Sequence, residues 1–333
     1  MHQAKSVIII HDGATDELMS ILLAASMPGI DIKGIMVLNA DCQGYPTAKV
    51  SSKLLDLINI KNVPVAVSGA RAWNPFPWTY RQYSLMVDLF PIVNQYKEDV
   101  IVPEPEIDFP LVKMVDKVYQ ENGNTPVTLL CLSPVTDIAE AIKSDPEFRN
   151  KISEIVWMGG VYMTSETTAG NIDTGIAPGA NPNAEWNVYW DPQATKDVLN
   201  SGINIKMFPL NVTNSVTLSG EIIRKHFLPE SDKYPALSLA AQMYSLVAFQ
   251  YGFSFWDTAA TAFLGKPNLY SLKKASVEID TSPDPVKQGT MTIEFVSDLE
   301  PLETSVEIAT GISVDEFYNY YVQQLKTLDF KRG

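Results

Sequence analysis

The sequence contains few of the residues that disulfide frameworks and histidine-based metal sites need. Two cysteines and three histidines are present among 333 residues. Cys42 and Cys131 are too few for the disulfide framework of a small secreted protein, and we expect both to be small buried residues. Three scattered histidines argue against a zinc site built on histidine.

Basic residues are scarce relative to acidic ones. Lys and Arg number 25 against 39 Asp and Glu, and the formal net charge is -14. A protein that binds DNA or RNA independently of sequence needs clustered positive charge against the phosphates. We therefore expect no nucleic-acid polymer as a partner.

Long apolar runs are missing as well. No stretch reaches the roughly 18 residues that a membrane-spanning helix requires, so we expect no membrane partner. A single basic residue, Lys5, precedes the first short apolar run, which is not the pattern of a signal peptide. We predict a cytoplasmic protein, and the abrupt lead-in before Val7 leaves open the alternative of a removed signal peptide.

Two common motifs of α/β enzymes are also absent. The chain has no Gly-x-Ser-x-Gly segment, which serine hydrolases use to present their nucleophile, and no Gly-x-Gly-x-x-Gly segment, which binds dinucleotides. Serine-hydrolase chemistry and dinucleotide binding are therefore not expected.

Short β-branched runs alternate with longer amphipathic stretches, which predicts an α/β fold with an open, mainly parallel β-sheet flanked by helices on both faces. Thr15 is placed to cap the first helix. The expected strands are Ser6 to Ile10, Gly34 to Leu38, Val63 to Val67, Val127 to Leu132, Glu154 to Met158 and Ile203 to Phe208. The expected helices are Asp16 to Ala25, Thr47 to Ile58, Phe109 to Gln120, Thr136 to Lys143, Pro192 to Asn200 and Ser231 to Tyr251.

The pattern changes beyond about residue 265. Ala275 to Ile279 and Thr290 to Val296 are expected to form a small late strand pair, followed by a C-terminal helix from Val314 to Leu325. No linker, repeat or low-complexity segment interrupts the chain, so we expect residues 1–333 to form a single domain.

Acidic and amide residues follow the expected strands at the edge where ligands of open α/β sheets bind. Asp12, Asp16 and Glu17 lie within six residues after the first strand, and Asn39 and Asp41 follow the second. Three carboxylates this close repel one another unless hydrogen-bond donors or a cation compensate, and a hard divalent cation is the simplest compensation. The alternative is a helix start whose acids stabilise the helix dipole.

A long loop rich in Gly, Thr, Pro and Asn spans residues 164–183, and loops of that length are commonly functional. Asn171 lies inside this loop, and Glu185 and Asn187 follow it. If that run is extended, the side chains of Glu185 and Asn187 face the same way. A carboxylate beside a carboxamide can bind sugar hydroxyls, which both donate and accept hydrogen bonds. An ordinary turn with an aromatic packing face is the alternative.

A further acid opens an apolar segment late in the chain. Asp257 follows Trp256 and precedes the Ala-rich run from Ala259 to Leu264. In isolation this acid is explained equally well as a helix cap.

Taken in order, the segments from Val7 to Leu264 resemble the inosine-uridine-preferring nucleoside hydrolase family. That family opens with an Asp-x-Asp-x-x-x-Asp-Asp motif after its first strand, and the run from Ile10 to Glu17 corresponds to it. Ile10 stands in place of the first Asp of the motif and Glu17 in place of the last. The resemblance implies one catalytic domain and an N-glycosidase that cleaves ribonucleosides with water into ribose and free base.

The resemblance also implies a calcium site and a set of substrate contacts. Asp12 would be both a Ca²⁺ ligand and the general base that activates water. The other ligands would be Glu17, Asp257 and the main-chain carbonyl of Leu132. The positions around the substrate would be Asp16, Asn39, Met158, Asn171, Glu185, Trp186 and Asn187.

Aromatic residues narrow the resemblance to the purine-preferring branch of the family. Trp256 precedes the distal Asp, where that branch carries a stacking tryptophan, and Tyr80 or Trp78 would supply the opposing ring. Asp41 matches an acid placed behind the base. Stacking makes a departing purine easier to protonate, so no dedicated side-chain acid is needed. The alternative is that these rings fill the core.

Two other functions share part of this pattern with nucleoside hydrolysis. A haloacid-dehalogenase-like phosphatase needs a nucleophilic Asp two residues before Asp12, and Ile10 excludes it. A non-catalytic relative that binds a nucleoside or ribose without releasing the base is the alternative, motivated by Ile10 and Glu17. We expect a small-molecule ribonucleoside as the partner and a homodimer or homotetramer as the assembly, as the resemblance implies.

Overall fold

The computed structural model describes residues 4–74, 82–94, 103–249, 252–296 and 306–330 of the chain. The strands are β1 (Lys5–His11), β2 (Ile30–Val37), β3 (Val65–Ser68), β4 (Glu106–Phe109), β5 (Val127–Leu132), β6 (Ile152–Met158), β7 (Ile205–Phe208), β8 (Tyr270–Ile279), β9 (Met291–Phe295) and β10 (Val306–Ile312). The α-helices are α1 (Thr15–Ser26), α2 (Gly44–Leu57), α3 (Tyr83–Asp88), α4 (Leu111–Glu121), α5 (Thr136–Ser144), α6 (Trp186–Trp190), α7 (Pro192–Leu199), α8 (Leu210–Thr213), α9 (Gly220–Ile222), α10 (Pro235–Ser245), α11 (Trp256–Ala262) and α12 (Val314–Leu325).

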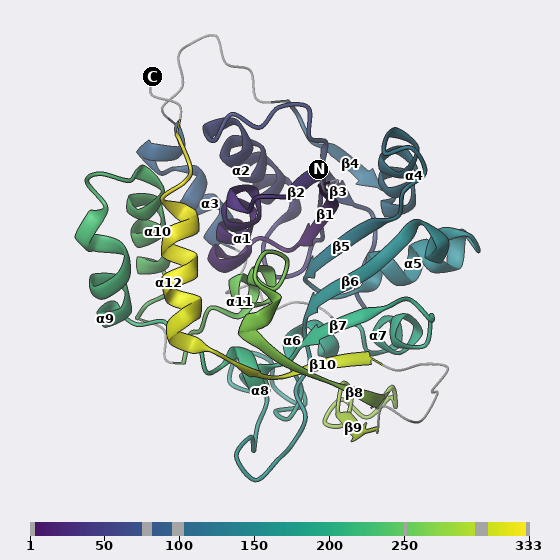
Figure 1. Ribbon diagram of the computed structural model, residues 1–333. Coiled ribbons are helices and arrows are strands. Elements are labelled where there is room, and N and C mark those ends of the chain that lie inside the picture. The colour runs from purple at the N-terminus through teal and green to yellow at the C-terminus, as the bar shows by residue number, and fades with distance from the viewer. Residues whose placement is uncertain (1–3, 75–81, 95–102, 250–251, 297–305, 331–333) are drawn as a thin grey trace.

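The strands form one ten-stranded sheet in the order β4-β3-β2-β1-β5-β6-β7-β10-β8-β9 (Figure 1). Pairing is parallel from β4 through to β10, and β8 and β9 join as antiparallel strands at the far edge. The predicted open, mainly parallel sheet and the late strand pair are both confirmed. The strand order reverses at β1, because β2 to β4 extend on one side of it and β5 to β7 on the other.

Helices cover both faces of this sheet (Figure 1). Val7 and Ile9 of β1 pack in one buried core with α1, α2, α10, α11 and α12, whereas Ile8 and Ile10 pack in a second core with α4, α5 and α7. All four side chains are fully buried. Burial on both faces explains why β1 is an unbroken apolar run and not an alternating one.

The structure differs from the expected elements at several places. The helix expected from Ser231 to Tyr251 is shorter, because α10 begins at Pro235, a residue suited to the first helical turn. Thr15 is the first helical residue of α1 and does not cap it, since Ala14 occupies the cap position. Strands β4 and β10 were not expected. No helix in the described ranges is long and apolar enough to cross a membrane.

A buried acid connects α5 to the end of β3. Asp137, in the first turn of α5, accepts a hydrogen bond from the hydroxyl of Ser68 on β3, and its second oxygen, Oδ2, has no partner. Burial raises the pKa of Asp137 to about 7. The folded protein therefore retains a proton on this carboxyl at pH values where the unfolded chain, with an Asp pKa of about 4, has released it.

The stability of the fold should depend on pH through Asp137. The stabilising contribution of its protonated form is complete below a pH of about 4 and is lost as the pH rises towards about 7. Asp137→Asn, which cannot titrate, should gain about 2–3 kcal/mol in unfolding free energy relative to the wild type between pH 5 and pH 8. Urea denaturation at the two pH values measures this gain. Glu121→Gln, at an exposed position of α4, is the control and should show no such gain; an equal response of both variants would contradict the prediction.

Candidate active site

A cavity of about 770 Å³ lies at the carboxyl ends of the central strands. Asp12 directly follows β1, and the pairing of His11 with Leu132 places the end of β5 beside it. This is the point where the strand order reverses, which is where open α/β sheets bind their ligands. The acidic lining residues are Asp12, Glu17, Asp41, Asp173, Glu185 and Asp257, and the described lining contains no Lys, Arg or His.

Ten of the predicted site residues line this cavity together. They come from segments spread over most of the chain and are Asp12, Glu17, Asp41, Met158, Asn171, Glu185, Trp186, Asn187, Trp256 and Asp257. Asp16, Asn39 and Leu132 do not line it. Tyr80 and its alternative Trp78 lie outside the described residues.

The carboxylates of Asp12, Glu17 and Asp257 form a buried acidic cluster in the lining of the cavity. Each side chain is at most 6% exposed. Burial is the main cause that raises the pKa of all three groups, and the negative charges of neighbouring acids, Asp41 among them, raise it further. Asp12 accepts a hydrogen bond from the backbone N–H of Asp41, and no basic side chain of the described lining compensates the charges of the three acids. The cluster therefore has more negative charge than its surroundings compensate.

The chemistry of these donors fits a hard divalent cation. Among the described residues, no three His, Cys, Asp or Glu side chains are arranged as a closed metal-binding group. However, Glu17 has a buried Oε2 atom without a hydrogen-bond partner, and it faces a cavity that contains other carboxylates. Carboxylate and carbonyl oxygens are the ligands that calcium and magnesium prefer.

The three predicted site residues that do not line the cavity have contacts elsewhere in the protein. Both oxygens of Asp16 accept hydrogen bonds within the protein, from the backbone of Asp257 and Thr258 among others, and its predicted ribose contact stays a prediction. Asn39 accepts a hydrogen bond from the backbone N–H of Gly44 at the start of α2. The side chain of Leu132 is buried in the core, which is compatible with a role for its main chain alone.

The expectation that the run around Glu185 and Asn187 is extended is wrong, because the short helix α6 begins at Trp186. Glu185 is its N-cap and accepts hydrogen bonds from the backbone N–H groups of Asn187 and Val188. It also accepts one from Gly160, at 2.8 Å. Burial raises the pKa of Glu185 to about 7, against the opposing effect of these donors.

Asn187 and Asn171 are held by the main chain of neighbouring segments. The side-chain amide of Asn187 donates to the carbonyl oxygen of Met158 at 3.0 Å. The side-chain oxygen of Asn171 accepts from the N–H of Trp186, also at 3.0 Å. The two carboxamides and Glu185 therefore face the same cavity from fixed positions, although α6 is helical and not extended.

Aromatic rings form a further part of the cavity lining. The indole N–H of Trp256 donates to Oδ1 of Asn214 at 2.7 Å, and its ring lies 4.6 Å from that of Phe253 between centroids. Trp186 and Trp190 form a second pair with a centroid separation of 5.4 Å. These rings offer flat apolar surfaces suited to a planar ligand.

Several lining residues were not among the predicted site residues. They are Tyr83, Asp173, Trp190, Asn214, Thr217, Phe253 and Ser254. Asp173 belongs to the long polar loop and Phe253 lies close to Trp256 in sequence, so proximity to predicted residues was the available signal for them. Tyr83 does not follow a predicted strand end, and no sequence signal identified it as a site residue.

Comparison with known proteins identifies the family. The model for "inosine-uridine preferring nucleoside hydrolase" matches residues 7–319. The chain belongs to this family. It is therefore a ribonucleoside hydrolase, as predicted, and its fold is that of the family.

The chain is similar to several members individually. The structure of an inosine-uridine preferring nucleoside hydrolase from Bacillus anthracis shares 30% identity and a TM-score of 0.82, covering 97% of this chain and 99% of that chain. A purine-preferring ribonucleoside hydrolase from Gardnerella vaginalis has the same fold, with 21% identity, a TM-score of 0.72 and the same two coverages. A pyrimidine-specific ribonucleoside hydrolase from Salmonella newport is 26% identical over 300 residues, or 85% of this chain and 86% of that protein.

The N-cap of α6 should contribute both to stability and to activity. Glu185→Ala leaves the N–H groups of Gly160, Asn187 and Val188 without their acceptor and should lower the unfolding free energy by about 1–2 kcal/mol. Glu185→Gln keeps one acceptor oxygen and should lose less. Urea denaturation of both variants at pH 7 measures the difference. Equal losses would show that the capping hydrogen bonds do not position α6.

Proposed function

We propose that this hydrolase cleaves the N-glycosidic bond of ribonucleosides by means of a calcium-activated water, with Asp12 as the general base and with a preference for purine nucleosides. One observation carries the proposal: one cavity is lined by buried carboxylates, by polar side chains held by main-chain hydrogen bonds, and by aromatic rings. These three kinds of group suit the attacking water, the ribose and the base.

The proposed cation ligands are Asp12, Glu17, Asp257 and the main-chain carbonyl of Leu132. Calcium at this place would supply Lewis-acid activation of water and neutralise the clustered carboxylates. Asp12 is oriented by a hydrogen bond from the backbone N–H of Asp41 to its Oδ2, at 3.3 Å. Its carboxylate accepts a proton from the water that attacks the anomeric carbon.

Sugar recognition is assigned to the wall of the cavity. Asn171, Glu185 and Asn187 can donate to and accept from the ribose hydroxyls. Because their positions are already set by main-chain hydrogen bonds, little conformational entropy is lost when ribose binds. Asp16 takes no part in this contact in the proposal, since its oxygens have other partners.

The base is assigned to the aromatic rings of the cavity lining. Trp256, held by Asn214, presents an indole face that stacks on a purine, and Trp186 and Trp190 provide further ring surface. Similar proteins include pyrimidine-specific and purine-preferring hydrolases. The purine preference proposed here rests on the area of aromatic surface, because a two-ring base gains more from stacking than a one-ring base.

A non-catalytic nucleoside-binding protein is the second candidate, and one observation favours it. Ile10, in the place of the first Asp of the family motif, is fully buried in the apolar core beneath the site. The residue therefore adds no polar group next to Asp12. The predicted homodimer or homotetramer stays a prediction.

Asp12→Asn should separate the two candidates. If Asp12 is the base, the variant should lose about a hundredfold or more in kcat, because the proton acceptor is removed while the shape is kept. Release of ribose from inosine, guanosine, adenosine, uridine and cytidine is measured by a reducing-sugar assay, with calcium and with a chelator. Near-normal turnover in Asp12→Asn would refute the base assignment. Absence of ribose release by the wild type, together with nucleoside binding, would favour the non-catalytic candidate.

Trp256→Ala should reduce the preference for purines. Loss of the stacking face should lower kcat/KM for inosine by about three- to tenfold, and that for uridine by less. The measurement is the ratio of the two kcat/KM values. Trp73→Ala is the matched control, because Trp73 is half-exposed and does not line the cavity. An unchanged ratio in Trp256→Ala would argue against stacking as the source of base preference.

A further inference from the structure

Helix α11, which carries Asp257, is capped by a residue from the other end of the chain. Its own N-cap residue, Phe255, makes no side-chain capping bond. Oδ2 of Asp16 on α1 instead accepts from the backbone N–H groups of Asp257 and Thr258, at 2.6 and 2.9 Å. Oδ1 of Asp16 accepts from the Thr258 hydroxyl at 2.8 Å. One carboxylate thereby satisfies two N–H groups at the start of α11.

A pair of tyrosines holds this carboxylate from the other side. The hydroxyl of Tyr244 on α10 donates to Oδ1 of Asp16 at 2.7 Å. The hydroxyls of Tyr244 and Tyr321 on α12 are 2.8 Å apart. Since Tyr244 has one hydroxyl hydrogen and donates it to Asp16, Tyr321 must be the donor between the tyrosines. The chain of hydrogen bonds thus runs from Tyr321 to Tyr244 to Asp16.

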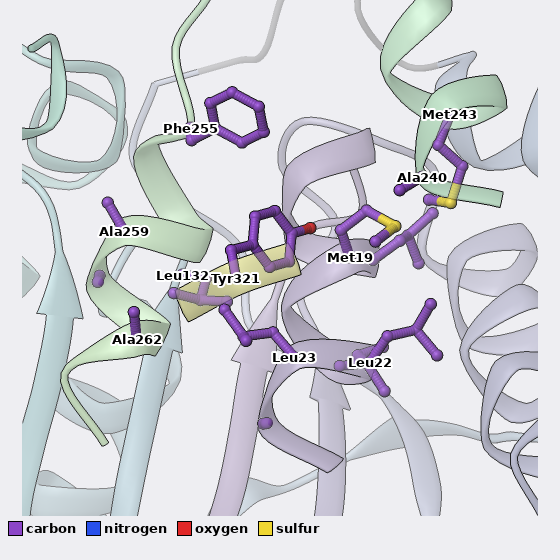
Figure 2. Close-up of a cluster of buried hydrophobic side chains, with 14 of the residues drawn as sticks. Met19, Leu22, Leu23, Leu132, Ala240, Met243, Phe255, Ala259, Ala262 and Tyr321 are labelled. Atoms are coloured by element: carbon purple, nitrogen blue, oxygen red, sulfur yellow. The ribbon is translucent and has the colours of Figure 1, made fainter. Parts of the chain in front are cut away.

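The hydrogen bonds between Tyr321, Tyr244 and Asp16 are hard to replace because their surroundings are apolar. Tyr244 and Tyr321 are fully buried, and the Tyr244 ring lies 4.7 Å from that of Phe255 between centroids. Figure 2 shows Tyr321 packed among Met19 and Leu23 of α1, with Phe255 beside it. A hydroxyl removed here leaves its partner in an apolar environment, where an unsatisfied polar group is costly.

We propose that Tyr244 and Tyr321 are positioning residues of the active site, which hold Asp16 in the orientation that ties α11 to α1 and so set the spacing between Glu17 and Asp257. Glu17 directly follows Asp16 on α1, and Asp257 is itself one of the N–H donors to Asp16. The inference rests on the proposed function, which assigns Glu17 and Asp257 as cation ligands. The tyrosine pair is thereby a determinant of cation affinity that touches neither cation nor substrate.

Calcium titration by calorimetry of the whole protein tests this inference without measuring turnover. Tyr244→Phe should weaken calcium binding by about tenfold, the effect typical of groups that orient metal ligands. Tyr321→Phe should weaken it less, because Tyr244 still contacts Asp16. The double variant should be no weaker than Tyr244→Phe alone, since the two hydroxyls act in series.

Tyr270→Phe is the matched control. Tyr270 is a buried tyrosine whose hydroxyl also donates to α11, to the carbonyl oxygen of Ala259, but it does not contact Asp16. A purely structural contribution would affect Tyr270→Phe and Tyr244→Phe alike, whereas the proposal expects calcium affinity to fall only in the latter. Thermal unfolding without calcium shows that each variant is folded, and Tyr321→Phe is the milder test if Tyr244→Phe does not fold.

The outcomes distinguish the inference from the function on which it rests. A wild type that binds calcium while Tyr244→Phe and Tyr321→Phe bind it equally well would overturn the inference and leave the proposed function intact. If the losses of calcium affinity in the two single variants add up in the double variant, Tyr321 does not act through Tyr244. A wild type that binds no calcium would overturn the calcium site and the inference together.

Discussion

The main constraint on this structure is the free-energy cost of burying several carboxylates at the carboxyl edge of one sheet. Asp12, Glu17 and Asp257 are almost completely removed from water, and no basic side chain among the described residues lines their cavity. Ionised groups in such a place need donors or a cation. Asp16 and Glu185 show how donors are supplied, since each accepts backbone N–H groups at the start of a helix. The remaining acids have fewer donors and suit a divalent cation.

The same arrangement links the fold to the proposed chemistry. The doubly covered sheet buries β1 on both faces, so the first polar residue after it, Asp12, emerges where the strand order reverses. Helices α6 and α11 start at this edge, and their first turns carry Asn187 and Asp257 into the cavity. At the start of each helix a carboxylate accepts hydrogen bonds from the backbone. For α11 this carboxylate is that of Asp16, which also accepts a hydrogen bond from Tyr244. Rigidity of this kind limits the reorganisation needed when substrate binds.

Much of the fold and of the site was predictable from the sequence. The alternation of apolar runs and amphipathic stretches predicted the parallel sheet, and the acids after the first run predicted part of the acidic lining of the cavity. Glu185 and Asn187 were predicted together although the reason was wrong, because α6 is helical and both residues reach the cavity from its first turn. Asn214 was not predicted as a site residue, since its role depends on the indole of Trp256 reaching it.

The sequence by itself determined which chemistry is available: clustered carboxylates, carboxamides and aromatic rings, with little positive charge. Local patterns suffice for this, because apolar periodicity sets the strands and polar residues follow them. Only the tertiary structure decided how the acids divide their roles. Asp16 and Glu17 are neighbours in sequence, yet one accepts a hydrogen bond from the N–H of Asp257, 241 residues later at the start of α11, and the other faces the cavity. A hydrogen bond over that separation depends on how α1, α10, α11 and α12 pack, and no local pattern encodes it.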